Sequence, residues 1–296
     1  MSLHSILQPE VVGAALLILF PMLFAGFAPE RLVGWADVLP RTARLTCPSL
    51  LCVPYVLVAH AFGIFRWEWL ALYALLPVAI ALLLDQARSA DAGRRGNWRD
   101  FVILATLGLA VDLRWLEPAW PMGWAAFGKM LLLDAGIFGF LAVRQLDGVG
   151  FDLRLRLSDA GVGLREFFLY AVIAIPLGLG LGFLHFHQSW PQPLHAIAAF
   201  IFTFFFIAIP EELFFRGWLQ NLLERRIGRV AALMLSAILF GLAHWNKRTT
   251  SFNWRYVLIA AIAGFFYGRA WRAQRRVGAS SITHATVDTL WSLWLR

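Results

Sequence analysis

Two adjacent glutamates and an arginine occur in segment 210–216, directly after the strongly apolar segment 204–209. Ionisable side chains are costly at membrane depth, and where they occur there they mark functional sites. In a helix Glu212 and Arg216 share one face with the acid first, so we expect them to pair. Glu211 lies about 100° around the helix from Glu212, which leaves it available for chemistry. The alternative is a buried ion cluster that only joins helices.

His244 lies at the same distance from an expected turn as Glu211, on the other side of the turn. The turn is centred near Ile227 and Gly228, and Glu211 and His244 are each about 16 residues from it. At about 1.5 Å per residue this is roughly 24 Å along each of two antiparallel helices. We therefore expect Glu211 and His244 at the same depth in the membrane.

The last apolar segment adds a second histidine and an aspartate. His284 and Asp288 are four residues apart, so a helix places them on one face. We expect both residues to share a site with Glu211 and His244. Separate structural roles for the four residues are the alternative.

The composition is that of a membrane protein. Hydrophobic residues make up 60% of the chain and charged residues 15%, and the mean hydropathy is +0.67. This composition excludes an ordinary soluble domain and predicts an all-α fold, a polytopic transmembrane helical bundle of about 8–10 spans. The candidate spans are residues 11–28, 45–65, 67–85, 100–113, 120–142, 166–186, 194–224, 229–246, 254–272 and 279–295.

The net charge of +8 comes mainly from arginines in short loops between the apolar segments, a distribution that indicates topology and not a nucleic-acid partner. By the positive-inside rule both termini are outside and the turn at 225–229 is cytoplasmic. The first apolar segment lacks the features of a signal peptide and is expected to remain as a helix. Because eukaryotic targeting patterns are absent from the sequence, we expect the bacterial inner (plasma) membrane, with the lipid bilayer as a partner.

A polar linker at 145–165 divides the chain. It separates an N-terminal transmembrane helical region of unknown role, 1–165, from a catalytic membrane domain, 166–296. Within the linker, residues 151–157 alternate between apolar and polar, which predicts a short strand or an amphipathic segment on the membrane surface.

The N-terminal region contains polar residues within apolar segments but no catalytic pattern. We expect Lys129 and Asp134 to pair across helices or to lie near an interface. Cys47 and Cys52 lack the clustering of a metal or redox site, so we expect them to be packing residues.

Three short motifs occur in order along the C-terminal half. They are E-E-x-x-x-R at Glu211, Glu212 and Arg216, F-x-x-x-H at Phe240 and His244, and H-x-x-x-D at His284 and Asp288. Together they resemble the CAAX protease and bacteriocin-processing family of intramembrane glutamic proteases, which are related to the eukaryotic prenyl-protein endopeptidase. The resemblance covers about residues 166–296 and does not extend to 1–165.

The resemblance implies an intramembrane endopeptidase that hydrolyses a peptide bond near the membrane in a membrane-anchored or exported protein substrate. Glu211 and His244 would activate a water molecule, and His284 and Asp288 would stabilise the oxyanion. Most members of the family have asparagine at the position of Asp288. Since an ionised aspartate cannot donate a hydrogen bond, we expect Asp288 to orient His284.

The resemblance also implies supporting roles for Glu212 and Arg216, which would hold the helix and balance the charge. We expect a reaction without a metal cofactor. The alternative is a zinc-dependent protease that holds its metal with Glu211, His244 and His284. An alternative of another class is a non-catalytic membrane immunity or scaffold protein, or a small transporter, although the sequence shows no internal symmetry of the kind that transporters have.

Overall fold

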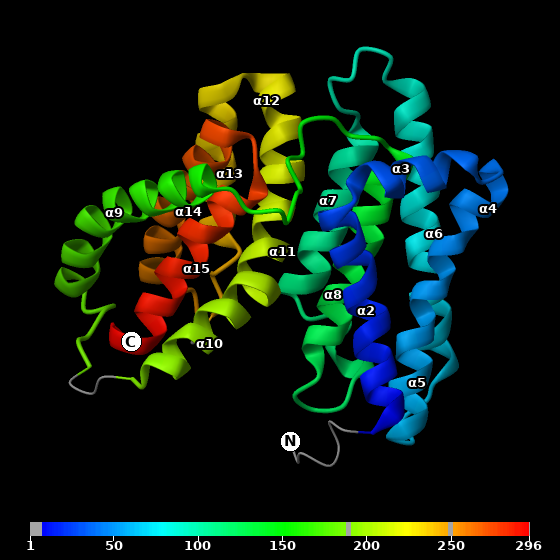
Figure 1. The fold of residues 1–296 in the computed structure, drawn as a ribbon, viewed down its shortest axis with the longest axis horizontal. Coiled ribbons are helices and arrows are strands. Elements are labelled where there is room, and N and C mark those ends of the chain that lie inside the picture. The colour runs from blue at the N-terminus through cyan, green and yellow to red at the C-terminus, as the bar shows by residue number, and fades with distance from the viewer. Residues whose placement is uncertain (1–7, 188–190, 248–250, 296) are drawn as a thin grey trace. The chain divides into compact units, whose positions relative to one another are not determined.

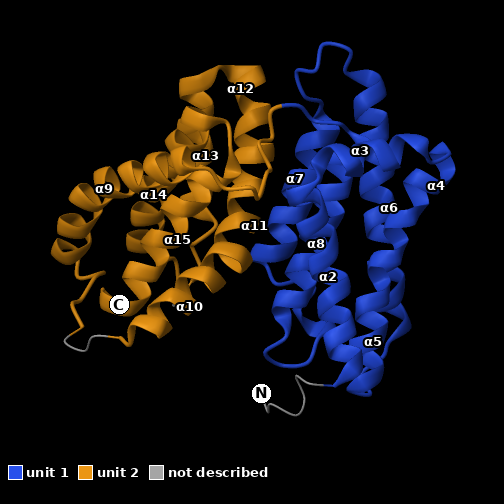
Figure 2. Ribbon diagram, viewed as in Figure 1, with its two compact units in different colours: residues 1–147 blue, residues 148–296 orange. Residues whose placement is uncertain are grey.

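The computed structural model describes residues 8–187, 191–247 and 251–295, and these residues form helices and loops without a strand. The predicted all-α fold is confirmed. The chain divides into two compact units, Met1–Asp147 and Gly148–Arg296 (Figures 1 and 2). The sequence places the division later, after residue 165.

The loop that opens the C-terminal unit accounts for this difference. The backbone N–H of Val277 donates to the carbonyl of Gly150 at 2.8 Å, so the loop contacts the C-terminal unit well before residue 165. Residues 151–156 form a loop. The short strand, one of the two structures that the alternating pattern predicts for this segment, is therefore not formed. Helix α9 then begins at Leu157.

The N-terminal unit consists mainly of α-helices, which are α2 (Pro9–Phe27), α3 (Pro29–Val38), α4 (Arg41–Thr46), α5 (Val53–Ala61), α6 (Trp67–Ala90), α7 (Trp98–Asp112) and α8 (Ala125–Ile137). Two short 3₁₀ segments, η1 (Cys47–Cys52) and η2 (Glu117–Ala119), and the π-helical segment η3 (Phe138–Val143) complete it. Helix α2 packs against α5 and α8, and α6 packs against η1 and α7. Both cysteines are free thiols.

Two charged residues of α8 have different surroundings. Lys129 lies 3.8 Å from Glu117 and so has an ion-pair partner. Asp134 is buried, and neither of its carboxylate oxygens has a hydrogen-bond partner among the described residues. Pairing is therefore observed for Lys129 and not for Asp134.

The C-terminal unit contains the α-helices α9 (Leu157–Gly180), α10 (Pro193–Thr203), α11 (Ile209–Glu212), α12 (Asn221–Ile227), α13 (Arg229–Leu242), α14 (Trp254–Gln274) and α15 (Val277–Trp294). The π-helical segments η4 (Phe204–Ala208) and η5 (Leu213–Gln220) flank α11. Helix α14 packs against α9, α13 and α15, and α15 also packs against α9.

Each of the ten segments that the sequence predicts as spans contains helix, although several helices end or begin a few residues inside the predicted bounds. Among the described residues, six helical stretches are long and apolar enough to cross a membrane, which is fewer than the predicted number of about eight to ten. They are Pro9–Phe27, Arg41–Ala61, Trp67–Ala90, Ala125–Val143, Leu157–Gly180 and Pro193–Ile227. The chain is thus an integral membrane protein.

The helical stretch that carries the two glutamates is unusually long. It runs without a break from Pro193 to Ile227 and contains 35 residues. At about 1.5 Å per residue it is roughly 50 Å long, more than the hydrocarbon thickness of a bilayer, and Glu211 lies near its middle. Pro210 has no N–H, so a regular α-helical ladder cannot continue through it, and the helix has π geometry on both sides of α11. Such widened turns are frequent at functional sites.

A glycine allows α15 to lie close to α9. A Cβ atom on Gly163 would lie 2.7 Å from Cγ2 of Ile282 and 2.9 Å from the carbonyl oxygen of Ala279. Thr283 Oγ1 donates to the carbonyl of Gly163 at 3.0 Å. These contacts fix α15 against α9 immediately before His284.

A buried arginine fixes the start of α15. Arg276 donates to Asp159 of α9 at 2.9 and 3.0 Å and to Asp152 at 3.0 Å. Burial acts to raise the pKa of Asp152, but hydrogen bonds from Arg154 and Arg276 outweigh it and lower this pKa to about 2. Asp152 therefore remains ionised at neutral pH, and its stabilising contribution is lost as the pH falls from about 3.8 to about 2.

Replacing Gly163 by alanine should destabilise the C-terminal unit, because the added methyl group has to displace α15 from α9. We expect the free energy of unfolding to fall by about 1–3 kcal/mol, measured by unfolding of the purified protein in detergent. Gly161→Ala on the same helix is the matched control, since a Cβ atom there meets nothing within 4 Å. Because alanine is the better helix former, the control should be neutral or slightly stabilising. Equal unfolding of the two variants would contradict the close packing at Gly163.

Candidate active site

Glu212 and Arg216 form the buried ion pair that their spacing predicts. Arg216 Nε donates to Glu212 Oε2 at 3.1 Å, and both side chains are fully buried. Arg216 Nη1 donates to Ser236 Oγ at 3.2 Å, and the guanidinium lies over the ring of Phe240, 5.3 Å from its centroid. Leaving either charge without its partner in this interior would cost several kcal/mol. Each residue therefore makes the burial of the other possible.

His284 lies between three carboxylates. Its Nδ1 is 3.0 Å from Glu212 Oε1, so the two oxygens of Glu212 contact Arg216 and His284 separately. Its Nε2 lies 3.5 Å from Asp288 Oδ2 and 3.9 Å from Glu211 Oε2. A carboxylate can only accept a hydrogen bond, so Nδ1 donates to Glu212. The structure thus brings Glu211, Glu212, His284 and Asp288 together.

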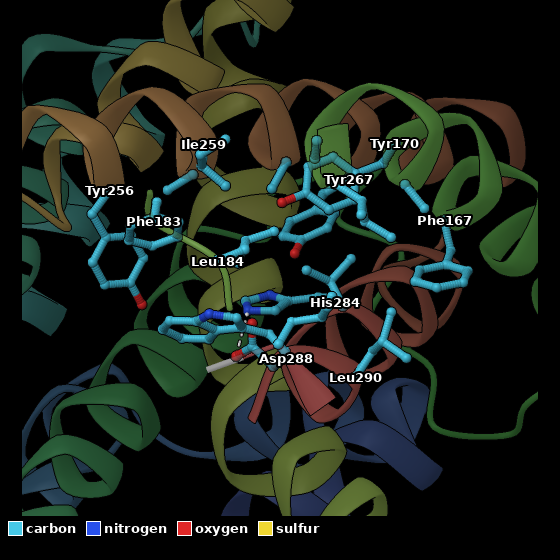
Figure 3. Close-up of a pocket in the computed structure, with 18 of the residues that line it drawn as sticks. Phe167, Tyr170, Phe183, Leu184, Tyr256, Ile259, Tyr267, His284, Asp288 and Leu290 are labelled. Atoms are coloured by element: carbon cyan, nitrogen blue, oxygen red, sulfur yellow. Dashed lines mark ion pairs between the residues drawn. The ribbon is translucent and has the colours of Figure 1, made fainter. Parts of the chain in front are cut away.

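Aromatic rings restrict the orientation of the His284 imidazole. Tyr267 stacks on it, with ring centroids 4.6 Å apart and an angle of 16° between the planes (Figure 3). Phe240 packs at nearly a right angle to it, with the centroids 5.6 Å apart. A ring that is stacked on one face and hydrogen-bonded at Nδ1 keeps Nε2 in a defined direction.

Glu211 differs from Glu212 in its surroundings. The side chain of Glu211 is 37% exposed, whereas that of Glu212 is 0% exposed. The Oε2 atom of Glu211 is nevertheless buried, and it has no hydrogen-bond partner among the described residues. Its distance of 3.9 Å to His284 Nε2 is too long for a hydrogen bond. Glu211 is therefore the carboxylate that stays out of the ion pair, as the sequence predicts.

The turn between α12 and α13 lies where the sequence places it. The two helices end and begin on either side of Gly228, whose φ is 81°. Across this turn the rings of Phe215 and Phe240 lie 5.0 Å apart. Glu211 and His244 each stand four residues farther from the turn on their own side. This register agrees with the equal depth predicted for Glu211 and His244.

His244 lies just beyond the end of α13. Its Nδ1 is 2.9 Å from the carbonyl oxygen of Phe240, and because a carbonyl only accepts, Nδ1 carries a proton. In the neutral imidazole Nε2 is then a hydrogen-bond acceptor. The ring packs against Phe240 and Tyr256, at centroid distances of 5.0 and 4.9 Å. Phe240 therefore contacts both histidines of the predicted site.

A cavity of about 60 Å³ borders His244, His284 and Asp288 (Figure 3). The remaining lining residues are mostly apolar or aromatic and belong largely to α9, α14 and α15. A water molecule needs about 10–15 Å³ of such space together with polar partners, so the cavity can hold water. Imidazole and carboxylate groups thus face an otherwise apolar space that water can occupy.

The donor atoms of the site are not arranged as a metal site. Within residues 8–187, 191–247 and 251–295, no group of three or more histidine, cysteine or acidic side chains could hold a metal ion. A catalytic zinc needs three protein ligands at about 2 Å from one point. Glu211, His244 and His284 do not form such a group in this arrangement.

The sequence motifs do not point to several polar residues around the site, namely Gln220, Ser236 and Tyr267, which are buried, and Tyr256, which is partly buried. Ser236 is the only hydroxyl residue of α13, and Gln220 follows Arg216 by four residues. Both positions could have been recognised as polar residues within apolar helices. The stacking of Tyr267 on His284 had no such signal, because the two residues lie on different helices.

Residues 193–290 match the model of the family described as "Rce1-like: Type II CAAX prenyl endopeptidase Rce1-like". No curated protein and no solved structure matches the chain. The matched segment extends from α10 into α15 and includes every residue of the predicted site. The family resemblance drawn from the three motifs is confirmed. The C-terminal unit of this integral membrane protein carries a domain of the Rce1-like type II CAAX prenyl endopeptidase family.

Proposed function

We propose that this protein is an intramembrane endopeptidase that hydrolyses a peptide bond near the membrane in a membrane-anchored or exported protein substrate. The observation that carries the proposal is the arrangement around His284. Glu212 holds one ring nitrogen at 3.0 Å, and the other nitrogen faces Asp288 and Glu211 beside a cavity that water can occupy. The match to a protease family supports the same reaction class.

Glu211 and His244 are the residues that would activate the attacking water. The free Oε2 atom of Glu211 and Nε2 of a neutral His244 are both acceptors, so each can take one hydrogen of a single water molecule. This arrangement leaves a lone pair of the water oxygen available to attack the scissile carbonyl. A carboxylate in an apolar environment is a suitable general base for this step.

His284 is the residue that would stabilise the oxyanion. When the imidazole is protonated at both nitrogens, Nδ1–H donates to Glu212 and Nε2–H remains available for a substrate oxygen. The distance from Nε2 to Asp288 Oδ2, 3.5 Å, is longer than a normal hydrogen bond. Asp288 therefore acts on the orientation and charge of His284, and its carboxylate does not itself donate to the oxyanion.

The reaction balances without a further reactant. The water oxygen forms a bond to the carbonyl carbon while Glu211 accepts a water proton. Collapse of the tetrahedral intermediate breaks the carbon–nitrogen bond, and the proton passes from Glu211 to the leaving amine. The products are a new carboxyl terminus and a new amino terminus. Glu212 and Arg216 hold the helix and balance the charge throughout.

We place the reaction in the outer half of a bacterial inner membrane. With the arginine-rich turn at 225–229 in the cytoplasm, Glu211 lies roughly 24 Å along the helix from that turn, in the outer half of a bacterial inner membrane. Substrates that are exported or anchored near the outer face would reach the site from there.

Glu211→Gln should abolish cleavage while leaving the protein folded, because the amide cannot accept the water proton. The measurement is mass spectrometry of terminal peptides from membrane and surface proteins of cells with the wild type or the variant at matched levels. A set of new termini should be lost, corresponding to a rate loss of about 10²–10⁴-fold. Glu10→Gln in α2, outside the matched segment, is the control and should retain these termini. Identical termini for wild type and Glu211→Gln would refute the peptidase and favour a non-catalytic scaffold.

Glu212→Gln should lower kcat more than Asp288→Asn does, because Glu212 contacts His284 at 3.0 Å and Asp288 only at 3.5 Å. We expect Asp288→Asn to reduce kcat by less than about tenfold, since one orienting contact remains. The assay is cleavage of a peptide that spans one of the cleavage sites identified by mass spectrometry, with the protein in liposomes. A large gain of activity in Asp288→Asn would instead indicate that residue 288 touches the oxyanion directly.

Activity should persist in a strong chelator, and elemental analysis of the active protein should find no stoichiometric metal. The physical reason is that the general base and the oxyanion donor are both side chains of the protein. Loss of activity in chelator together with recovery on adding Zn²⁺ would establish the zinc-dependent alternative.

A further inference from the structure

A chain of buried polar side chains continues from the site toward the end of α12. Glu212, Arg216, Gln220 and Ser236 are all 0% exposed. Arg216 Nη1 donates to Ser236 Oγ at 3.2 Å, and Ser236 Oγ lies 3.2 Å from Gln220 Oε1. Polar groups this deep need partners, because an unsatisfied buried donor or acceptor costs about 1–3 kcal/mol.

Gln220, at the far end of this series of hydrogen-bonded side chains, also has partners on other helices. Gln220 Nε2 donates to Glu224 Oε1 at 3.2 Å and approaches the carbonyl of Gly268 at 3.5 Å. Glu224 in turn accepts from Arg275 at 2.6 Å. A Cβ atom at position 268 would lie 2.6 Å from Gln220 Oε1, so the glycine provides the space that Gln220 occupies. The amide is thereby fixed between α12, α13 and α14.

The planar guanidinium of Arg216 connects Ser236 to Glu212 of the site. Its Nε contacts Glu212 and its Nη1 contacts Ser236, while Nη2 has no hydrogen-bond partner among the described residues. Hydrogen bonds at two of its nitrogen atoms restrict the orientation of the planar guanidinium, so the contact with Ser236 helps to direct Arg216 toward Glu212. The second oxygen of Glu212 then holds His284 Nδ1 at 3.0 Å.

We propose that Ser236 and Gln220 are positioning residues that fix the direction of His284 Nε2 through Arg216 and Glu212. Neither residue lines the cavity beside His284. Their effect on catalysis is therefore exerted entirely through the hydrogen-bonded chain. The inference rests on the proposed function, in which Nε2 of His284 faces the substrate oxygen.

The first test compares the kinetics of Ser236 and Gln220 variants in liposomes. Ser236→Ala and Gln220→Ala should lower kcat by about 10- to 100-fold with KM nearly unchanged, since a displaced catalytic group slows the chemical step without affecting substrate binding. The pH profile of kcat should also change shape, because His284 loses a fixed carboxylate partner. Ser236→Thr keeps the hydroxyl and should restore most of the activity.

Ser280→Ala is the matched control. Ser280 is also 0% exposed, lies on the helix of His284, and has its hydroxyl 3.0 Å from the carbonyl oxygen three residues before it, where the distance for Ser236 is 3.1 Å. Among the described residues it makes no hydrogen bond to Arg216 or Glu212. Its loss should change kcat by less than about twofold, which separates positioning from a general effect of removing a buried hydroxyl.

A measurement without substrate separates this inference from the proposed function. The ¹⁵N resonances of His284 in histidine-labelled protein should shift in Ser236→Ala and Gln220→Ala and not in Ser280→Ala. If the wild type cleaves no peptide but the resonances shift as expected, the peptidase proposal fails and the positioning contact stands. If the wild type cleaves and the folded Ser236→Ala and Gln220→Ala variants match it in kcat, pH profile and His284 resonances, the positioning role is refuted.

Discussion

Glu212 and Arg216 are both fully buried, and each would leave an isolated charge in a low-dielectric interior if the other were absent. This constraint shapes the surroundings of the pair. Nη1 of Arg216 takes Ser236 as a second partner, and the free oxygen of Glu212 takes His284. The ion pair thus joins a structural network on one side to a histidine beside a cavity that water can occupy on the other. A single residue, Glu212, belongs to both.

The unusual geometry of the long helix separates the tasks of its two glutamates. Pro210 interrupts the regular ladder, and the π-helical segments η4 and η5 place wider turns on either side of the glutamates. Glu212 points into the interior and is completely paired, whereas Glu211 is partly exposed with one unpartnered oxygen among the described residues. Of the two adjacent glutamates, Glu212 is therefore fixed by its partners, whereas Glu211 keeps one oxygen atom without a hydrogen bond among the described residues. This separation is what a general base beside a structural ion pair requires.

Much of the site could be predicted from the sequence because it depends on local spacing. The i,i+4 relation predicts the Glu212–Arg216 pair, and equal distances from Gly228 predict the register of η5 and α13. Contacts between distant helices could not be predicted in this way. Glu212 and His284 are 72 positions apart, and their hydrogen bond depends on how α15 packs. The helical repeat of a sequence does not predict such packing between helices. The strand that the alternation at 151–157 allows is absent for a related reason, since the side chain of Asp152 pairs with Arg154 and with Arg276, the residue before α15.

The charges around His284 explain why Glu211 is the reactive carboxylate in the proposed mechanism. Glu211, Glu212 and Asp288 bring three negative charges when ionised, and Arg216 with a protonated His284 brings two positive ones. Arg216 is committed to Glu212, and the 3.5 Å contact places Asp288 closer to His284 than Glu211, at 3.9 Å. The surplus charge therefore falls on Glu211, whose Oε2 atom lacks a hydrogen-bond donor among the described residues. A water proton neutralises that charge, so the step that generates the nucleophile also relieves the electrostatic imbalance of the buried site.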